Sequence, residues 1–152
     1  MLRALIMSTV LYGFAFTAHA QSPTQSHDLS KAILKKDAPA AETLLTAGAN
    51  PNAAIEIVPG FPTTFLITAA TTNNLDLVKL LLKYKAQVNQ PDGFKGTALM
   101  AAVGKGNKAM VELLLASGAD VRPKDDDGKD ALALAKEGGN AEIIALLQQQ
   151  PK

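Results

Sequence analysis

Few residues of this 152-residue chain have the types and spacing that catalysis would require. Beyond Ala20 the sole histidine is His27, and no nucleophile motif surrounds any serine. A Ser–His–Asp arrangement would therefore depend on His27 alone. The absence of cysteine excludes disulfides, thiolate metal ligands and cysteine nucleophiles. We predict no catalytic residue and interpret His27 as a solvated side chain near the start of the first helix.

The acidic run Asp125, Asp126 and Asp127 before Gly128 has the composition of a calcium-binding loop. If Gly128 occupied the sixth position of such a loop, the first position would be Pro123 and the twelfth Leu134. Calcium binding requires carboxylates at both of those positions, so the spacing excludes this site. We interpret the run as an acidic turn close to a helix N-terminus, where negative charge is favoured. The sequence predicts no bound metal and no cofactor.

A fixed repeat organises most of the chain. Thr97, Leu99 and Leu114 belong to its clearest copy, and residues of the same kind recur 33 positions earlier and later. A period of this length is typical of one supersecondary unit stacked on itself, in a protein built for contact surface.

The repeated unit resembles the ankyrin repeat. Residues 96–102 and 111–121 carry the family pattern, although the Pro and His that follow the family's Thr are absent here. A weaker first copy ends at residues 44–52, and the spacing from Gly48 to Gly118 exceeds two periods by about four positions. The resemblance implies an all-α solenoid of about four helix–turn–helix units with β-hairpin-like loops. We place the units at about residues 27–58, 59–91, 92–124 and 125–150.

Residues that share a phase of the repeat have matching conformational roles. We expect three residues to cap the first helix of a unit through a side-chain oxygen: Thr64, Thr97 and Asp130. We expect left-handed backbone where the first helix of a unit ends, at Asn73, Gly106 and Gly139. The second helices should end in the same way at Gly48 and Gly118, whereas Lys85 at that phase should be strained.

Residues 1–20 are expected to form a cleaved signal peptide. Arg3 is their only charge, residues 4–18 are largely apolar, and Ala18-His19-Ala20 offers small residues at the cleavage positions. About 15 apolar residues are too few to span a bilayer comfortably, although an uncleaved anchor is the alternative. We expect the mature chain to begin with a polar segment at residues 21–26, and to be periplasmic or secreted.

The charge balance gives no support for binding to nucleic acid or to a membrane after cleavage. Without Arg3 the chain has 14 basic and 14 acidic residues, whereas nucleic-acid binding usually needs a basic excess on one face. We interpret the small group Lys31, Lys35 and Lys36 as solvated.

Resemblance to ankyrin proteins implies protein binding through the loop tips and the inner-helix face. The residues that we predict to contact a partner are Ile55, Ile57, Val58, Phe61, Thr71, Thr72, Phe94, Lys105, Lys129 and Glu137. Phe61 and Phe94 share one tip position on adjacent units and could anchor an interface, or each ring could fold back over its own loop. The insertion, with Ile55 and Ile57 around Glu56, predicts a short strand that contacts a partner or packs on the first unit as a cap.

We therefore expect a non-enzymatic, monomeric module that binds one partner protein of unknown identity. The resemblance to small exported ankyrin proteins implies one of two functional classes: an accessory of a stress-defence enzyme, or an immunity protein against a toxin. The alternatives are a groove that binds a small ligand or performs catalysis, and a structural module that associates with itself.

Overall fold

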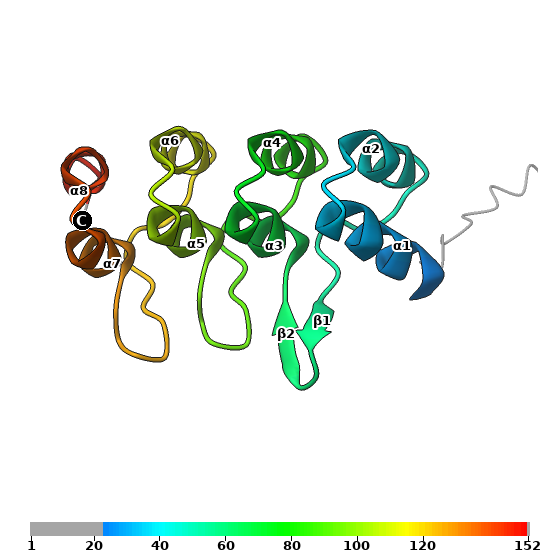
Figure 1. The fold of residues 1–152 in the computed structure, drawn as a ribbon, viewed down its shortest axis with the longest axis horizontal. Coiled ribbons are helices and arrows are strands. Elements are labelled where there is room, and N and C mark those ends of the chain that lie inside the picture. Colours follow the sequence, from blue (N-terminus) through cyan, green and yellow to red (C-terminus); the bar gives the residue numbers. More distant parts are fainter. Residues whose placement is uncertain (1–22, 152) are drawn as a thin grey trace, which may run out of the picture.

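The computed structural model describes residues 23–151, so the expected signal peptide and its cleavage site lie outside the described residues. Eight helices within that range form four antiparallel pairs (Figure 1). The pairs are α1 (Pro23–Leu34) with α2 (Ala38–Thr46), α3 (Phe65–Thr71) with α4 (Leu75–Lys83), α5 (Ala98–Gly104) with α6 (Lys108–Ala116), and α7 (Ala131–Gly138) with α8 (Ala141–Gln148). The first connection between pairs contains strands β1 (Ile55–Val58) and β2 (Phe61–Thr63).

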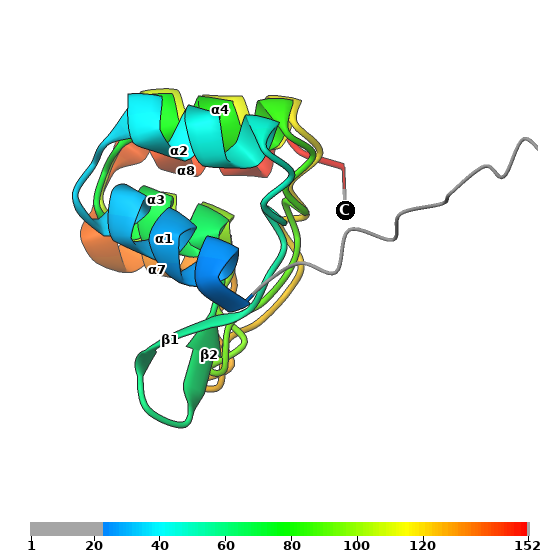
Figure 2. The same ribbon diagram turned by 90° about the vertical axis from the view of Figure 1, so that its right-hand side faces the viewer.

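The helices form two layers, an inner row and an outer row. Helices α1, α3, α5 and α7 lie side by side in the inner row, and α2, α4, α6 and α8 form the outer row (Figure 1). The connections between units project from the inner row, and the hairpin extends furthest from it (Figure 2). This arrangement confirms the predicted all-α solenoid.

Side-chain caps fix where the inner helices begin. The hydroxyl of Thr64 accepts a hydrogen bond from Ile67 N–H, and that of Thr97 accepts one from Met100 N–H. The Asp130 carboxylate accepts a hydrogen bond from Ala133 N–H. These three caps are the predicted ones. The outer helices are capped by a second set at a matching phase: Asp37, Asn74, Asn107 and Asn140.

Left-handed backbone ends the helices at the predicted positions. The φ angles of Asn73, Gly106 and Gly139 are 58°, 65° and 68°. Gly118 has φ of 88°, and Lys85 adopts φ of 67° at the same phase, as expected. An L-residue in this region is strained because its Cβ approaches the following carbonyl oxygen. Glycine would therefore be a more stable residue than lysine at position 85.

The core is continuous from the first unit to the last. It is formed where the inner row meets the outer row, by fully buried side chains such as Leu29, Leu77 and Leu114. Ala69 and Ala102 are also fully buried, on the neighbouring helices α3 and α5. Small side chains at these positions allow the inner helices to approach each other closely.

Two features of the fold differ from the expectation. Helix α1 begins at Pro23, so residues 23–26 lie within the helix rather than in a polar segment before it. In this first part of α1, Thr24, His27 and Asp28 are exposed to solvent. Among residues 23–151, moreover, only the first connection forms a paired hairpin, and the later connections are turns without a ladder.

Candidate functional site

The insertion between the first two units forms the antiparallel hairpin of β1 and β2. Ile55 pairs with Thr63 and Val58 with Phe61, with an irregularity between Glu56 and Val58. Ile55 is buried against the core and β1 contacts α1. Of the two alternatives for the insertion, this residue therefore packs on the first unit and does not contact a partner. Ile57 and Val58 are instead 48% and 56% exposed. Past its first residue, the hairpin therefore presents apolar side chains to solvent.

Phe61 and Phe94 stack on each other across adjacent units. Their ring centroids lie 4.6 Å apart and the ring planes differ by 8°. Even so, the side chains are 43% and 50% exposed. The rings therefore do not fold back over their own loops: each covers the other, and the pair forms one exposed aromatic surface at the tips.

Backbone contacts between the tips bring the two rings together. The Gly93 N–H donates to the Pro62 carbonyl at 2.7 Å. A Cβ atom on Gly93 would lie 3.1 Å from Pro62 Cδ, so glycine permits this close approach. The tip of the third unit is held to that of the fourth by a hydrogen bond from Asp126 N–H to the Phe94 carbonyl, at 3.1 Å. The tips form a connected row rather than independent loops.

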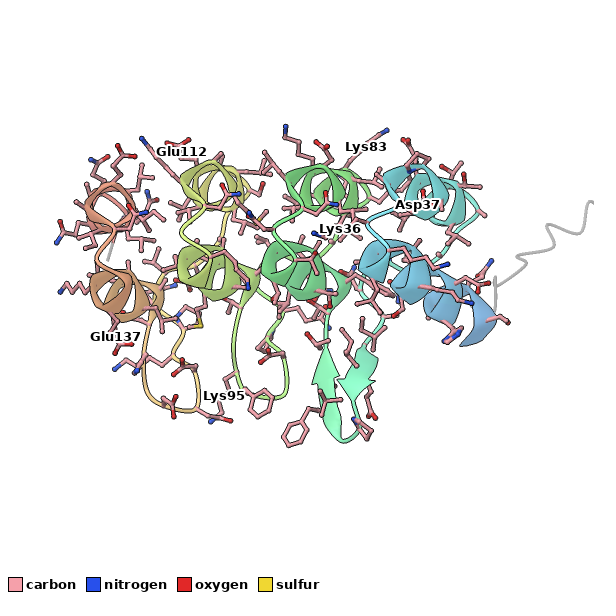
Figure 3. The ribbon with its side chains drawn as sticks, viewed as in Figure 1. Lys36, Asp37, Lys83, Lys95, Glu112 and Glu137 are labelled. Carbon is pink, nitrogen blue, oxygen red and sulfur yellow. The ribbon has the colours of Figure 1, made fainter. Side chains whose placement is uncertain are left out.

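Two ion pairs join charged side chains along the tips and the inner row. Lys95 Nζ lies 2.9 Å from Asp126 Oδ1, joining the third tip to the fourth (Figure 3). Lys129 Nζ lies 2.9 Å from the Glu137 carboxylate on α7. This hydrogen bond and the negative charge of Glu137 raise the pKa of Lys129 above its usual value. Two of the predicted contact residues, Lys129 and Glu137, are thus paired with each other.

The acidic turns have a structural role in the tips. Asp92 Oδ1 accepts the backbone N–H groups of Phe94 and Gly96, at 2.9 and 2.8 Å. Asp125 Oδ1 accepts those of Asp127 and Lys129 in the same way, at the equivalent phase of the next unit. Each carboxylate therefore stabilises the turn that precedes an inner helix. Within residues 23–151 no group of three or more His, Asp or Glu side chains is placed to hold a metal ion.

A cavity of about 250 Å³ lies between the hairpin and the inner row, and we call it the inner cavity. Its lining residues come from α1, the hairpin, α3 and the third tip: Leu34, Ile57, Thr63, Ile67, Thr68, Thr71, Thr72 and Asp92. Three predicted residues, Ile57, Thr71 and Thr72, meet here. Lys105 is exposed beyond α5 and is not part of the lining.

Five lining residues were not among the predicted contacts: Leu34, Thr63, Ile67, Thr68 and Asp92. Leu34 is 48% exposed although it follows the buried Ile33. A signal was available, because Leu34 precedes Thr71 by one period plus the insertion. An apolar side chain at the phase of Thr71 could have been assigned to the inner face.

All large exposed hydrophobic side chains of the described residues gather on one part of the molecule. They are Leu34, Ile57, Val58, Phe61 and Phe94. Together they extend from the end of α1 over the hairpin to the third tip, and we call them the apolar surface. Leu34 and Ile57 meet at the inner cavity, Val58 pairs with Phe61, and Phe61 stacks on Phe94. Exposed apolar side chains grouped in this way are typical of interaction sites in soluble proteins.

Two wider hollows of about 540 Å³ each lie near the C-terminal end, around Val121 and Arg122. Arg122 is held there by Asp120, whose Oδ2 lies 2.8 Å from Arg122 Nη2. These hollows contain none of the predicted contact residues. Within the part of the chain that the structure describes, none of the helices combines the length and apolar character needed to cross a membrane.

Comparison with protein families agrees with this geometry. The family model described as ankyrin repeats (3 copies) matches residues 29–125, which is more than half of the chain. A comparison with curated proteins found no match. The matched segment begins in α1, includes the hairpin and the third unit, and ends in the acidic turn before α7. Ankyrin repeats are generally protein–protein interaction modules. This chain belongs to the ankyrin-repeat family.

Proposed function

We propose that this protein is an exported, non-enzymatic adaptor that binds one partner protein through the apolar surface. The observation that carries the proposal is the gathering of Leu34, Ile57, Val58, Phe61 and Phe94 on one side of the solenoid. Aromatic side chains at the centre of an interface commonly contribute most of its binding energy. The stacked rings of Phe61 and Phe94 are held in one orientation, so little conformational freedom is lost when a partner covers them.

A binding role fits the charges of this face better than catalysis does. Lys95 and Asp126 neutralise each other, as do Lys129 and Glu137. The carboxylates of Asp92 and Asp125 stabilise backbone turns. General acid–base catalysis instead needs a titratable group held within reach of a substrate and tuned toward neutral pH.

The proposed location is the periplasm or the extracellular space, on the basis of the sequence pattern of residues 1–20. In that location the partner would be either a stress-defence enzyme that the protein assists or a toxin that it neutralises. Both roles require a rigid contact surface, which a stacked solenoid supplies. Mass measurement of the exported protein should give a chain that starts at Gln21, and a retained N-terminus would overturn the proposed export.

Site-specific crosslinking in the native compartment tests the binding surface directly. A photoreactive amino acid at Val58, which is 56% exposed, should give a crosslinked product with one partner protein. The matched control carries the same amino acid at Lys79, an exposed position on the outer helix α4. A partner that crosslinks from Lys79 and not from Val58 would overturn the assignment of the surface.

A further inference from the structure

The inner cavity has the size of a site for one side chain. Its volume of about 250 Å³ lies below the range of roughly 300–1,000 Å³ that is usual for sites of small molecules and cofactors. It opens beside the apolar surface, with which it shares Leu34 and Ile57. A partner that covers the apolar surface is therefore placed to insert a side chain into this cavity.

Two of the four threonines that line the inner cavity use their hydroxyl protons in hydrogen bonds within the protein. Thr68 Oγ1 donates to the Thr64 carbonyl at 2.9 Å, and Thr72 Oγ1 donates to the Thr68 carbonyl at 3.0 Å. These hydroxyl protons are thus already used within α3 and its cap. A polar occupant would lose hydrogen bonds to water and gain no donor from Thr68 or Thr72. An aliphatic or aromatic side chain has no such penalty.

Asp92 is the one charged residue among those that line the inner cavity. Its Oδ1 accepts two backbone N–H groups, from Phe94 and Gly96. Of the hydrogen bonds made by residues 23–151, none is to Asp92 Oδ2, and Asp92 forms no ion pair there. The cavity wall therefore combines the apolar side chains of Leu34, Ile57 and Ile67 with one carboxylate at its side. An apolar group next to a cation is complementary to such a wall.

We propose that the inner cavity is a specificity pocket for an extended partner segment in which an aliphatic or aromatic residue adjoins a lysine or arginine. The apolar side chain enters between Leu34, Ile57 and Thr71, and the cation lies against Asp92. This inference rests on the proposed binding function and adds the chemistry of the segment that is recognised. The hairpin supplies one wall of the pocket, so the pocket exists because of the insertion between the first two units.

The probe for the test is N-acetyl-leucyl-lysine amide, titrated into the isotope-labelled protein and followed by the NMR signals of backbone amides. We expect shifts at Thr71, Thr72 and Gly93 that saturate at millimolar concentrations. N-acetyl-leucyl-glutamate amide should bind about two- to fivefold more weakly, the range for an exposed ion pair. The absence of shifts at these residues, or equal binding of the two probes, would overturn the proposal.

Two pairs of variants separate the pocket from the fold. Asp92→Asn keeps an oxygen that can accept the turn hydrogen bonds but removes the charge, and Asp125→Asn makes the same change in the equivalent turn of the fourth unit. Asp92→Asn should remove the preference for the lysine probe, whereas Asp125→Asn should keep it. Thr71→Trp should fill the pocket and abolish binding, whereas Gly104→Trp, at the same phase one unit later and with open space around it, should not. The opposite result in either pair would overturn the proposal.

The same variants distinguish this inference from the proposed function. If crosslinking from Val58 persists in Thr71→Trp and in Asp92→Asn with unchanged yield, the pocket proposal fails and the binding surface stands. If crosslinking from Val58 fails in the parent protein, the proposed function fails first. The alternative occupant of the pocket is a second copy of this chain, and sedimentation of the parent protein tests it. Concentration-dependent dimers that Thr71→Trp abolishes would show that a second copy fills the pocket and would overturn the proposal.

Discussion

Asn52 and Asn89 make the same two hydrogen bonds at equivalent points of successive units. Asn52 Nδ2 donates to the Lys85 carbonyl at 3.2 Å, and Asn52 Oδ1 accepts the Gln87 N–H at 2.7 Å. Asn89 bonds in the same way to the Gly118 carbonyl and to the Asp120 N–H, at 3.0 and 2.8 Å. Each asparagine thus joins the start of one connection to the end of the next outer helix.

Asn89→Ala should destabilise the protein by about 1 kcal/mol, because two hydrogen bonds to the backbone are lost from a solvent-exposed site. The measurement is urea unfolding followed by circular dichroism. Gln90→Ala changes the neighbouring residue, whose side chain makes no hydrogen bond among the described residues, and should leave the midpoint within error. Equal effects of the two substitutions would show that Asn89 does not join the units.

Lys85→Gly should stabilise the protein by about 1 kcal/mol, because glycine adopts the left-handed conformation without strain. Lys85 has φ of 67°, where Gly118 occupies the same phase of the next unit. Lys105→Gly is the matched control, since Lys105 has φ of −83° at the end of α5 and gains nothing from glycine. Thermal unfolding of both variants checks the prediction, and a stabilising Lys105→Gly with a neutral Lys85→Gly would contradict it.

Local features of the fold could be predicted from the sequence because they depend on residues close together in the chain. The N-cap role of Thr97 requires only a hydroxyl within reach of the N–H group of Met100, in the first turn of the same helix. The left-handed conformation of Asn73 and Lys85 follows from their phase in the repeat. Periodicity therefore predicted the number of units and the left-handed backbone of Lys85, but not the same conformation at Lys36 and Lys95.

Features of the candidate site that depend on contacts between units could not be predicted in the same way. The phase of Phe61 and Phe94 placed both rings at tips, but their stacking also requires the Gly93–Pro62 contact between tips. The burial of Ile55 beside the exposed Ile57 depends on how the hairpin packs against α1. Neither the ring stacking nor the hairpin packing follows from a local pattern, because each is determined by contacts between separate units.

The Asp120–Arg122 pair should make the protein sensitive to acid below pH 4. Side-chain and backbone hydrogen bonds from Arg122 lower the pKa of Asp120 from 3.8 to about 2. A carboxyl whose pKa is lowered by folding stabilises the folded state above its unfolded pKa of 3.8, and this contribution is lost as the pH falls through about 2. Carboxyl NMR titration should give a midpoint near the lower value.

Arg122→Gln should raise the pKa of Asp120 toward its usual value, because the side-chain hydrogen bond is the largest cause of the shift. The increase should be incomplete, since the backbone N–H of residue 122 still donates to Asp120 Oδ1. An unchanged midpoint in this variant would show that the pair does not form in solution.

Replacing both stacked rings tests the apolar surface as an interface. Phe61→Ala with Phe94→Ala should weaken binding of the partner by well over tenfold, because an aromatic anchor at the centre of an interface is worth about 2 kcal/mol or more. The melting temperature should fall only slightly, since both rings are about half exposed and a stacked pair contributes about 0.5–1.5 kcal/mol. Quantitative capture of the crosslinked partner and thermal unfolding give the two measurements.

Phe65→Ala provides the contrast, because Phe65 is fully buried and its truncation should cost about 3–5 kcal/mol of stability. If the double variant melted as far below the parent as Phe65→Ala while binding stayed intact, the stacked rings would be packing residues rather than contacts. The binding face would then have to lie along the inner row, where Thr71, Lys105 and Glu137 are exposed. We expect the loss of binding, because the stack is formed by two rings that the core does not need.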